Sequence, residues 1–139
     1  MNSYTSYFAK VPTLVKNDII PIGIALWQPK FFSGHTIGLI APKRYMLNDS
    51  LSEDEYTEMY IKDVLEKLDL NLFISLVNKI SKGKDVAFCC YEKPSDFCHR
   101  HIFAKWFTEK TGEIIEEFGQ IVTPAPIINN KNSQLFLFD

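Results

Sequence analysis

Runs of apolar residues along the chain alternate with polar and helix-patterned stretches, which predicts strands and helices in turn. Residues 2–8 are rich in strand-forming residues and predict a first strand. The apolar run over 18–27 predicts a second strand, which we expect to begin after Pro21 because proline lacks a ladder donor. Residues 85–91 are apolar without alternation between their ends, which is typical of a strand buried on both faces of a parallel sheet. Residues 28–49, punctuated by proline and glycine, are expected to be irregular.

Two helices are predicted between residues 52 and 83. Ser52 and Glu55 have the spacing of a capping box, and apolar residues follow at helical spacing as far as Leu68. Asp69 is expected to cap a second helix. Gly83 is expected to end that helix in a left-handed turn, a conformation that glycine adopts without a steric penalty.

A third helix is predicted after the buried strand. Ser95 or Asp96 is expected to cap it, and it should run to about Lys110 and stop at Gly112. A last strand is expected over 113–118.

A strand, a helix and a further strand joined by short connections form the crossover unit of parallel sheets. We therefore expect an α/β fold, specifically a compact three-layer, Rossmann-like domain with a mostly parallel central sheet. The length of 139 residues fits one such domain over 1–118. Residues 119–139, rich in proline and asparagine before a short apolar end, are expected to form a C-terminal extension.

The overall charge and the cysteine content exclude several classes of protein. A net charge of −2 argues against strong autonomous DNA binding over a broad surface. Cys89, Cys90 and Cys98 all fall within ten residues, which does not describe a disulfide framework. No signal-peptide pattern follows Met1, and the apolar run over 19–27 is too short to span a bilayer. We expect a cytoplasmic protein without a membrane partner.

Most of the reactive side chains gather in one strand-to-helix turn, Cys90-Tyr-Glu92-Lys-Pro-Ser-Asp-Phe-Cys98-His99-Arg100. Ligands of open parallel sheets bind outside the carboxyl ends of the strands, where this turn is expected to lie. A helix N-terminus there favours anions and thiolates, and Arg100 adds a donor pair suited to carboxylate or phosphate. The candidate catalytic residues are Cys90, Glu92, Cys98, His99 and Arg100.

This block, followed by Ala104-Lys-Trp106 on a predicted helix, resembles the signature of the bacterial and phage domain of unknown function 488 family. Three further segments fall in the expected order, namely residues 4–8, 29–34 and 39–42. The resemblance implies a Rossmann-like fold, with the cysteines, glutamate, histidine and arginine of the block as signature residues. It also makes Thr5, Ser6 and Tyr7, together with Arg100, candidate ligand-binding residues.

Structural roles for the same residues remain open. His99 shares a helix face with Phe103, so it is either a core histidine bonded to a backbone carbonyl or a catalytic group. Cys89 points to the opposite face of the strand from Cys90 and is expected to be a small core residue. Cys90 itself fits the core or the site. Glu92 and Arg100 could form an ion pair that only pins the turn.

The spacing of the cysteines argues against a bound metal. Cys90 and Cys98 lack the paired Cys-x-x-Cys spacing of structural zinc sites, and adjacent helical residues such as Cys98 and His99 point about 100° apart. We therefore expect no metal site, and the sequence identifies no cofactor. A thiol redox switch that joins Cys90 to Cys98 is a further hypothesis.

The C-terminal segment Gln134-Leu135-Phe136-Leu137-Phe138 resembles the pentapeptide by which bacterial replication and repair proteins bind the DNA sliding clamp. An extended segment of this kind presents alternate apolar side chains to a groove while the glutamine fixes its orientation. Gln134, Leu135, Leu137 and Phe138 are the candidate partner-binding residues. The alternative is a strand that packs on its own domain.

Two main hypotheses follow for function. In the first, the chain is an enzyme for a nucleotide or nucleic-acid-related substrate: Arg100 and helix N–H groups hold an anion, Glu92 or His99 moves a proton, and Cys90 or Cys98 is the nucleophile. In the second, the domain is a scaffold, and the tail is an adaptor for the sliding clamp.

Overall fold

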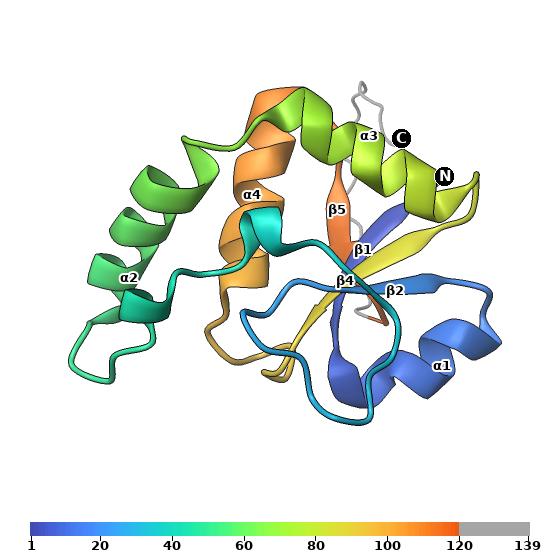
Figure 1. Cartoon of the computed structure of the whole chain (residues 1–139), viewed down its shortest axis with the longest axis horizontal. Helices are drawn as coiled ribbons and strands as arrows, with labels where there is room; N and C mark the ends of the chain where they lie inside the picture. The colour runs from blue at the N-terminus through green and yellow to red at the C-terminus, as the bar shows by residue number, and fades with distance from the viewer. Residues whose placement is uncertain (120–139) are drawn as a thin grey trace, which may run out of the picture.

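The computed structural model describes residues 1–119, so the predicted extension over 119–139 and its clamp-like pentapeptide lie outside the described residues except for Gly119. Within the described part, five strands form one parallel sheet in the order β3-β2-β4-β1-β5 (Figure 1). The strands are β1 (Ser3–Tyr7), β2 (Ile20–Gly23), β3 (His35–Thr36), β4 (Val86–Cys90) and β5 (Ile115–Glu117).

Four α-helices are distributed over both faces of this sheet in residues 1–119. They are α1 (Val11–Lys16), α2 (Glu53–Tyr60), α3 (Leu70–Ser81) and α4 (His99–Thr111). A π-helical turn over Ile61–Leu65 continues α2, and three short 3-10 turns occupy Phe8–Lys10, Gly38–Ile40 and Arg44–Met46.

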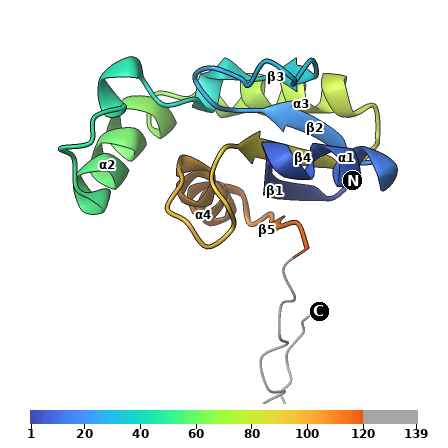
Figure 2. The same ribbon diagram turned by 90° about the horizontal axis from the view of Figure 1, so that it is seen from below.

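The alternation of side chains along the central strand β4 divides the core into two layers. Phe88 faces Phe73 of α3 and Phe103 of α4, whereas Ala87 belongs to the opposite cluster with Leu14 of α1. Figure 2 shows the strands one after another, with α2 and α4 on one side and α1 on the other. The expected three-layer α/β fold is confirmed, and so is the prediction that β4 is buried on both faces.

The second strand begins before Pro21 rather than after it, so that expectation is wrong. The backbone N–H groups of Ile20 and Ile24 donate to the carbonyls of Asp85 and Cys89, on the β4 side. Because the ladder alternates, the nitrogen of Pro21 faces the opposite side, where pairing with β3 starts only at Ile22. No donor is required at Pro21, and the strand tolerates it.

The first two helices begin as the sequence predicts. Ser52 and Glu55 exchange both hydrogen bonds of the capping box, and the Asp69 carboxylate accepts from the backbone N–H of Leu72. The second helix ends one residue earlier than expected, because Lys82 already adopts a left-handed conformation with φ of 50° ahead of Gly83.

The start of the third helix is the main local correction. α4 begins at His99, and neither Ser95 nor Asp96 caps it. Its N-cap is Cys98, with extended backbone angles of φ −158° and ψ 146° and no side-chain cap. Gly112 ends this helix in a left-handed conformation, as predicted. The two-residue strand β3 lies in the segment that we expected to be irregular.

The alternation of backbone hydrogen bonds along β2 gives the first testable prediction. Pro21→Ala should change the free energy of unfolding by less than about 1 kcal/mol, because no ladder bond depends on that position. Ile22→Pro should cost about 3 kcal/mol or more, because it removes a donor to β4 and a buried side chain. Urea denaturation of both variants measures the difference, and equal losses would contradict the alternation described here.

Candidate functional site

The candidate site lies where the carboxyl ends of β1 and β4 meet. Tyr7 and Cys90, the last residues of these strands, are register partners. From there the chain passes to α1 on one face of the sheet and to α4 on the other, and such a divergence opens a crevice at the strand ends.

A cavity of about 590 Å³ lies beside this crevice, at the end of β4, and no β1 residue belongs to its lining. Its walls come from the segment after β2, the segment before α2, the start of α2 and the β4–α4 turn. The lining residues are Ala25, Leu26, Trp27, Pro42, Leu47, Asn48, Asp49, Leu51, Ser52, Glu53, Tyr56, Cys90, Tyr91, Glu92, Phe97, Cys98 and His99.

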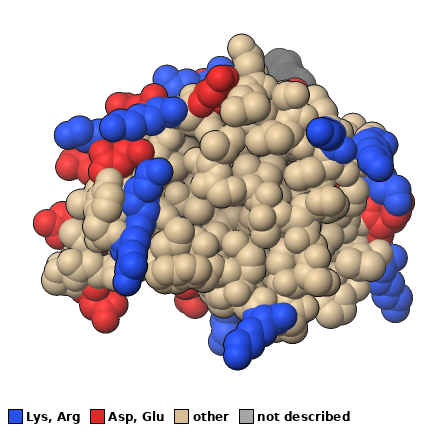
Figure 3. Space-filling model, in the orientation of Figure 1, with Lys and Arg blue, Asp and Glu red and all other residues tan. Residues whose placement is uncertain are grey.

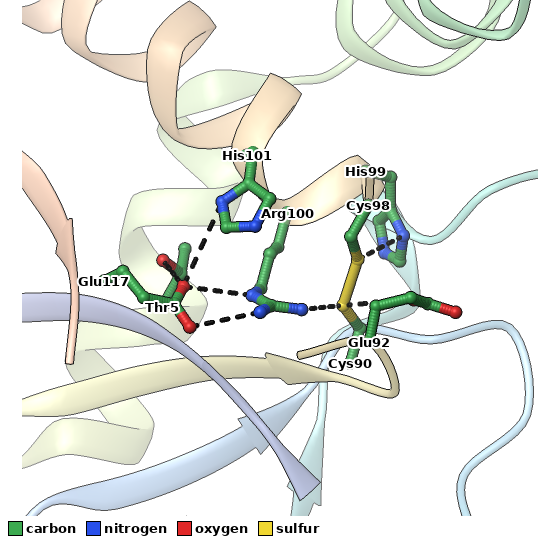
Figure 4. Close-up of polar contacts among 8 residues, drawn as sticks. All are labelled: Thr5, Cys90, Glu92, Cys98, His99, Arg100, His101 and Glu117. Carbon is green, nitrogen blue, oxygen red and sulfur yellow. Dashed lines mark hydrogen bonds and ion pairs between the residues drawn. A yellow bond between two sulfur atoms is a disulfide. The ribbon is translucent and has the colours of Figure 1, made fainter. Parts of the chain in front are cut away.

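Two cysteines meet at the base of the cavity. Cys90 is the last residue of β4 and lies on the face that α4 covers, whereas Cys98 is the N-cap of α4. Both are buried, and their sulfurs are joined in a disulfide across a Cα–Cα separation of 7.7 Å (Figure 4). The sequence hypothesis that paired these two thiols is consistent with this contact.

Cys89 behaves as the core residue that the sequence predicts. It is fully buried on the α1 side of the sheet, and burial raises the pKa of its thiol to about 12. This thiol stays neutral, away from the cavity.

His99 makes the backbone contact expected of a core histidine, and its catalytic role stays a prediction. Its Nε2 lies 2.9 Å from the carbonyl oxygen of Ile24, which can only accept, so Nε2 carries a proton. Burial lowers the pKa of His99 to about 4, and the nearby charge of Arg100 acts in the same direction. The imidazole is therefore neutral, and its Nδ1 presents a lone pair at 3.7 Å from the Sγ of Cys98.

Arg100 is fully buried and directs its donors to internal partners rather than to the cavity. Its Nε and Nη2 donate to the two carboxylate oxygens of Glu117, each at 3.1 Å, and its Nη1 donates to the Sγ of Cys90 at 2.8 Å (Figure 4). The partner is therefore Glu117 rather than Glu92, which corrects the ion pair considered from the sequence. An anion-binding role for Arg100 stays a prediction.

The candidate ligand-binding residues of β1 lie beside this ion pair and not in the cavity lining. The hydroxyl of Thr5 donates to Oε1 of Glu117 at 2.6 Å, and His101 Nδ1 lies 4.0 Å from the same oxygen. Ser6 is buried, and its hydroxyl has no partner within residues 1–119. Sequence reasoning did not find Glu117, because a glutamate near the end of a short strand carries no signal of the arginine beside it.

Glu92 is exposed and borders the cavity, with its Oε1 at 3.9 Å from the Sγ of Cys90. Asp49 and Glu53 add two more carboxylates to the lining, and no lysine or arginine belongs to the lining residues within 1–119. Burial raises the pKa of Tyr56 far above its ordinary value, and the charge of Glu92 adds to the effect. The cavity therefore has an acidic character.

Of the two arguments against a metal site, the missing Cys-x-x-Cys spacing stands, whereas the divergence of adjacent helical residues does not apply to this structure. Adjacent residues diverge by about 100° only when both are helical, but Cys98 is an extended N-cap. The Sγ atoms of Cys90 and Cys98 and a ring nitrogen of His99 consequently lie within 4.8 Å of one another. In the reduced state, these two sulfurs and the imidazole have the chemistry of a donor set for zinc-like ions.

A family model described as the active DUF488-N3 subclade, DUF488-N3a, matches residues 17–111. No curated protein and no solved structure matches the chain. Within residues 1–119, no helix has both the length and the apolar character needed to cross a membrane.

The buried ion pair should stabilise the fold far more than a surface pair does. Glu117→Gln should lower the free energy of unfolding by about 3 kcal/mol or more, because it leaves the guanidinium of Arg100 buried without a counter-charge. The matched change Asp18→Asn, in an exposed pair with Lys84, should cost less than about 1 kcal/mol. Chemical denaturation measures both free energies of unfolding. Similar losses in the two variants would contradict a stabilising role of the buried pair.

Proposed function

Because this chain belongs to the DUF488 family, in its active DUF488-N3 subclade, we propose that it is an enzyme for a nucleotide or nucleic-acid-derived substrate whose base enters the cavity beyond β4. The observation that carries the proposal is the convergence of Cys90, Cys98 and His99 on one cavity at the strand ends. Reactive groups gathered in a partly enclosed crevice are the usual mark of an active site.

The aromatic walls of the cavity favour a flat ring as the bound group. Trp27, Tyr56, Tyr91 and Phe97 all line it, and the last three pack edge-to-face against other aromatic rings or stack on them. Aromatic side chains bind nucleobases by stacking, largely without regard to base identity. A base is therefore a better match to this cavity than an aliphatic chain.

The charges of the lining support a binding mode in which the phosphates of such a substrate lie outside the cavity. Asp49, Glu53 and Glu92 repel anionic groups, whereas they accept hydrogen bonds from the amino and imino groups of a base. Arg100, which the sequence suggested for an anion, is occupied by Glu117 and Cys90. We therefore propose that recognition concerns the base and that the phosphates stay at the solvent side.

Two groups are suited to moving a proton in such a reaction. Glu92 is exposed at the cavity beside Cys90, and a carboxylate in this position can accept or donate a proton at a bound substrate. His99 Nδ1 lies inside, next to Cys98, with the ring oriented by the Ile24 carbonyl. A reactive group, a base and an orienting partner form the general pattern of an active site.

Thermal denaturation with a panel of compounds tests the proposal. Nucleosides and nucleotides should raise the melting temperature by several degrees, since a ligand at a hundredfold its Kd adds about 2.7 kcal/mol, whereas inorganic phosphate should have little effect. Trp27→Ala should reduce the shift because it removes a stacking wall. Phe31→Ala, a change in an exposed aromatic residue outside the lining, is the control. A panel without any shift would sink the proposal.

The C-terminal pentapeptide supports a second, independent proposal, that Gln134, Leu135, Leu137 and Phe138 dock on the DNA sliding clamp. The face of the domain in Figure 3 carries charges of both signs around a broad uncharged centre, rather than a basic surface for DNA. Tethering to a clamp would bring the domain to nucleic acid without such a surface, by raising its local concentration.

Binding of the full chain to purified clamp tests the tail. Replacing Leu137 and Phe138 by alanine should weaken the interaction at least about a hundredfold, because it removes two apolar anchors. Replacing Asn132 and Ser133 by alanine, just before the pentapeptide, should leave the Kd unchanged. Equal affinities for the wild type and the Leu137, Phe138 variant would exclude this role.

A further inference from the structure

We propose that Cys90, Cys98 and His99 bind one zinc-like divalent ion, with a fourth coordination position that faces the cavity. The three donor atoms lie within 4.8 Å of one another, on residues that line the cavity wall (Figure 4). Three protein donors and one open position are the arrangement of catalytic zinc sites, whereas structural sites use four protein donors.

The distances between the donor atoms can be compared with those of a zinc site. Zinc binds thiolate sulfur at about 2.3 Å and imidazole nitrogen at about 2.0 Å, so the donors of a tetrahedral site lie about 3.5–3.8 Å apart. His99 Nδ1 already lies 3.7 Å from Cys98 Sγ. Cys90 Sγ and Cys98 Sγ would have to separate from their bonded contact, which requires reduction of the disulfide and rotation of the two side chains.

The backbone spacing of the cysteines also favours an ion between them. Their Cα atoms are 7.7 Å apart, whereas disulfides usually span roughly 4.4–6.8 Å. An atom placed between two thiolates lengthens the bridge by one further bond, which fits the wider separation. The reduced, metal-bound pair therefore matches this backbone better than the oxidised pair does.

The groups behind the three donors have the features of an outer coordination shell. His99 Nε2 donates to the Ile24 carbonyl, which fixes the ring and leaves Nδ1 free to bind an ion. Arg100 Nη1 donates to Cys90 Sγ, and in the reduced protein a guanidinium at this position favours a thiolate. Two thiolates neutralise the ion, and Glu117 neutralises Arg100, so the buried assembly carries no net charge.

This inference rests on the proposed function for the identity of the substrate, and it deepens that function by naming the reacting centre. The cysteines would then be ligands rather than nucleophiles. The ion would act as a Lewis acid on a substrate atom or a water molecule bound at its open coordination position. Glu92 lies beside Cys90 at the cavity edge, where its carboxylate could accept a proton from a substrate or water bound to the ion.

Cobalt substitution of the full-length, reduced protein tests the site. Co²⁺ should bind in a one-to-one ratio and produce the visible bands of a tetrahedral ion and a thiolate-to-cobalt charge-transfer band. Zinc should displace it and abolish these bands. Wild-type protein that is folded and reduced but develops neither band would overturn the proposal.

The ligands are identified by variants matched for residue type. Cys98→Ser and His99→Ala should weaken metal binding by at least about a hundredfold, more than the loss of an outer-shell partner costs. Cys89→Ala, which changes the buried cysteine on the other face of the sheet, should keep the bands. Circular dichroism of the metal-free variants establishes that they are folded. Folded Cys98→Ser protein with unchanged affinity would also overturn the site.

The metal site and the base-binding proposal fail in different ways. Melting-temperature shifts with nucleosides in chelator-treated protein, without any cobalt bands, would leave the enzyme proposal standing and remove the ion. Cobalt bands without a nucleoside shift in either metal state would retain the site and remove the nucleobase as its substrate.

Discussion

The buried contact between Arg100 and Glu117 is the interaction on which the rest of the site depends. It joins the first turn of α4 to β5, while Thr5 adds β1 and Cys90 adds β4 to the same cluster. A guanidinium without exposure to solvent persists only when its donors are satisfied, so these elements must meet at one place. That meeting sets the position of α4, and α4 in turn sets the positions of Cys98 and His99.

The fold places reactivity at the carboxyl ends of the strands for a geometrical reason. β1 and β4 are neighbours, yet their following helices lie on opposite faces of the sheet, so the strand ends stay uncovered. The cavity lies beside this opening, at the end of β4, and its walls come from segments that are distant in the sequence, such as Trp27, Tyr56 and Phe97. Cys90, Cys98 and His99 are buried among core residues and still belong to the cavity lining, so the core supports them at the cavity wall.

Within residues 1–119, the lining of the cavity carries acidic side chains and no lysine or arginine. The positive charge of Arg100 is enclosed with the negative charge of Glu117, so it acts on Cys90 at short range and hardly on a ligand. The neutral ring of His99 and the disulfide of Cys90 and Cys98 form the inner wall, and the carboxylate of Glu92 lies at the outer edge. For this reason the proposed function assigns the cavity to an uncharged or weakly basic ring rather than to a phosphate. The proposals for a base and for a zinc-like ion both follow from this arrangement.

The sequence by itself determined the elements whose signals are local. The apolar run of β4, the capping box at Ser52 and the Asp69 cap depend on neighbouring residues, and the parallel α/β class follows from their order. The clustering of reactive residues from Cys90 to Arg100 was also readable, because it lies within one turn. Only the tertiary structure decided that Glu117 pairs with Arg100, that Pro21 fits inside β2, and that Cys98 stays extended and brings three donors together. These features depend on contacts between segments far apart in the chain, which no local pattern encodes.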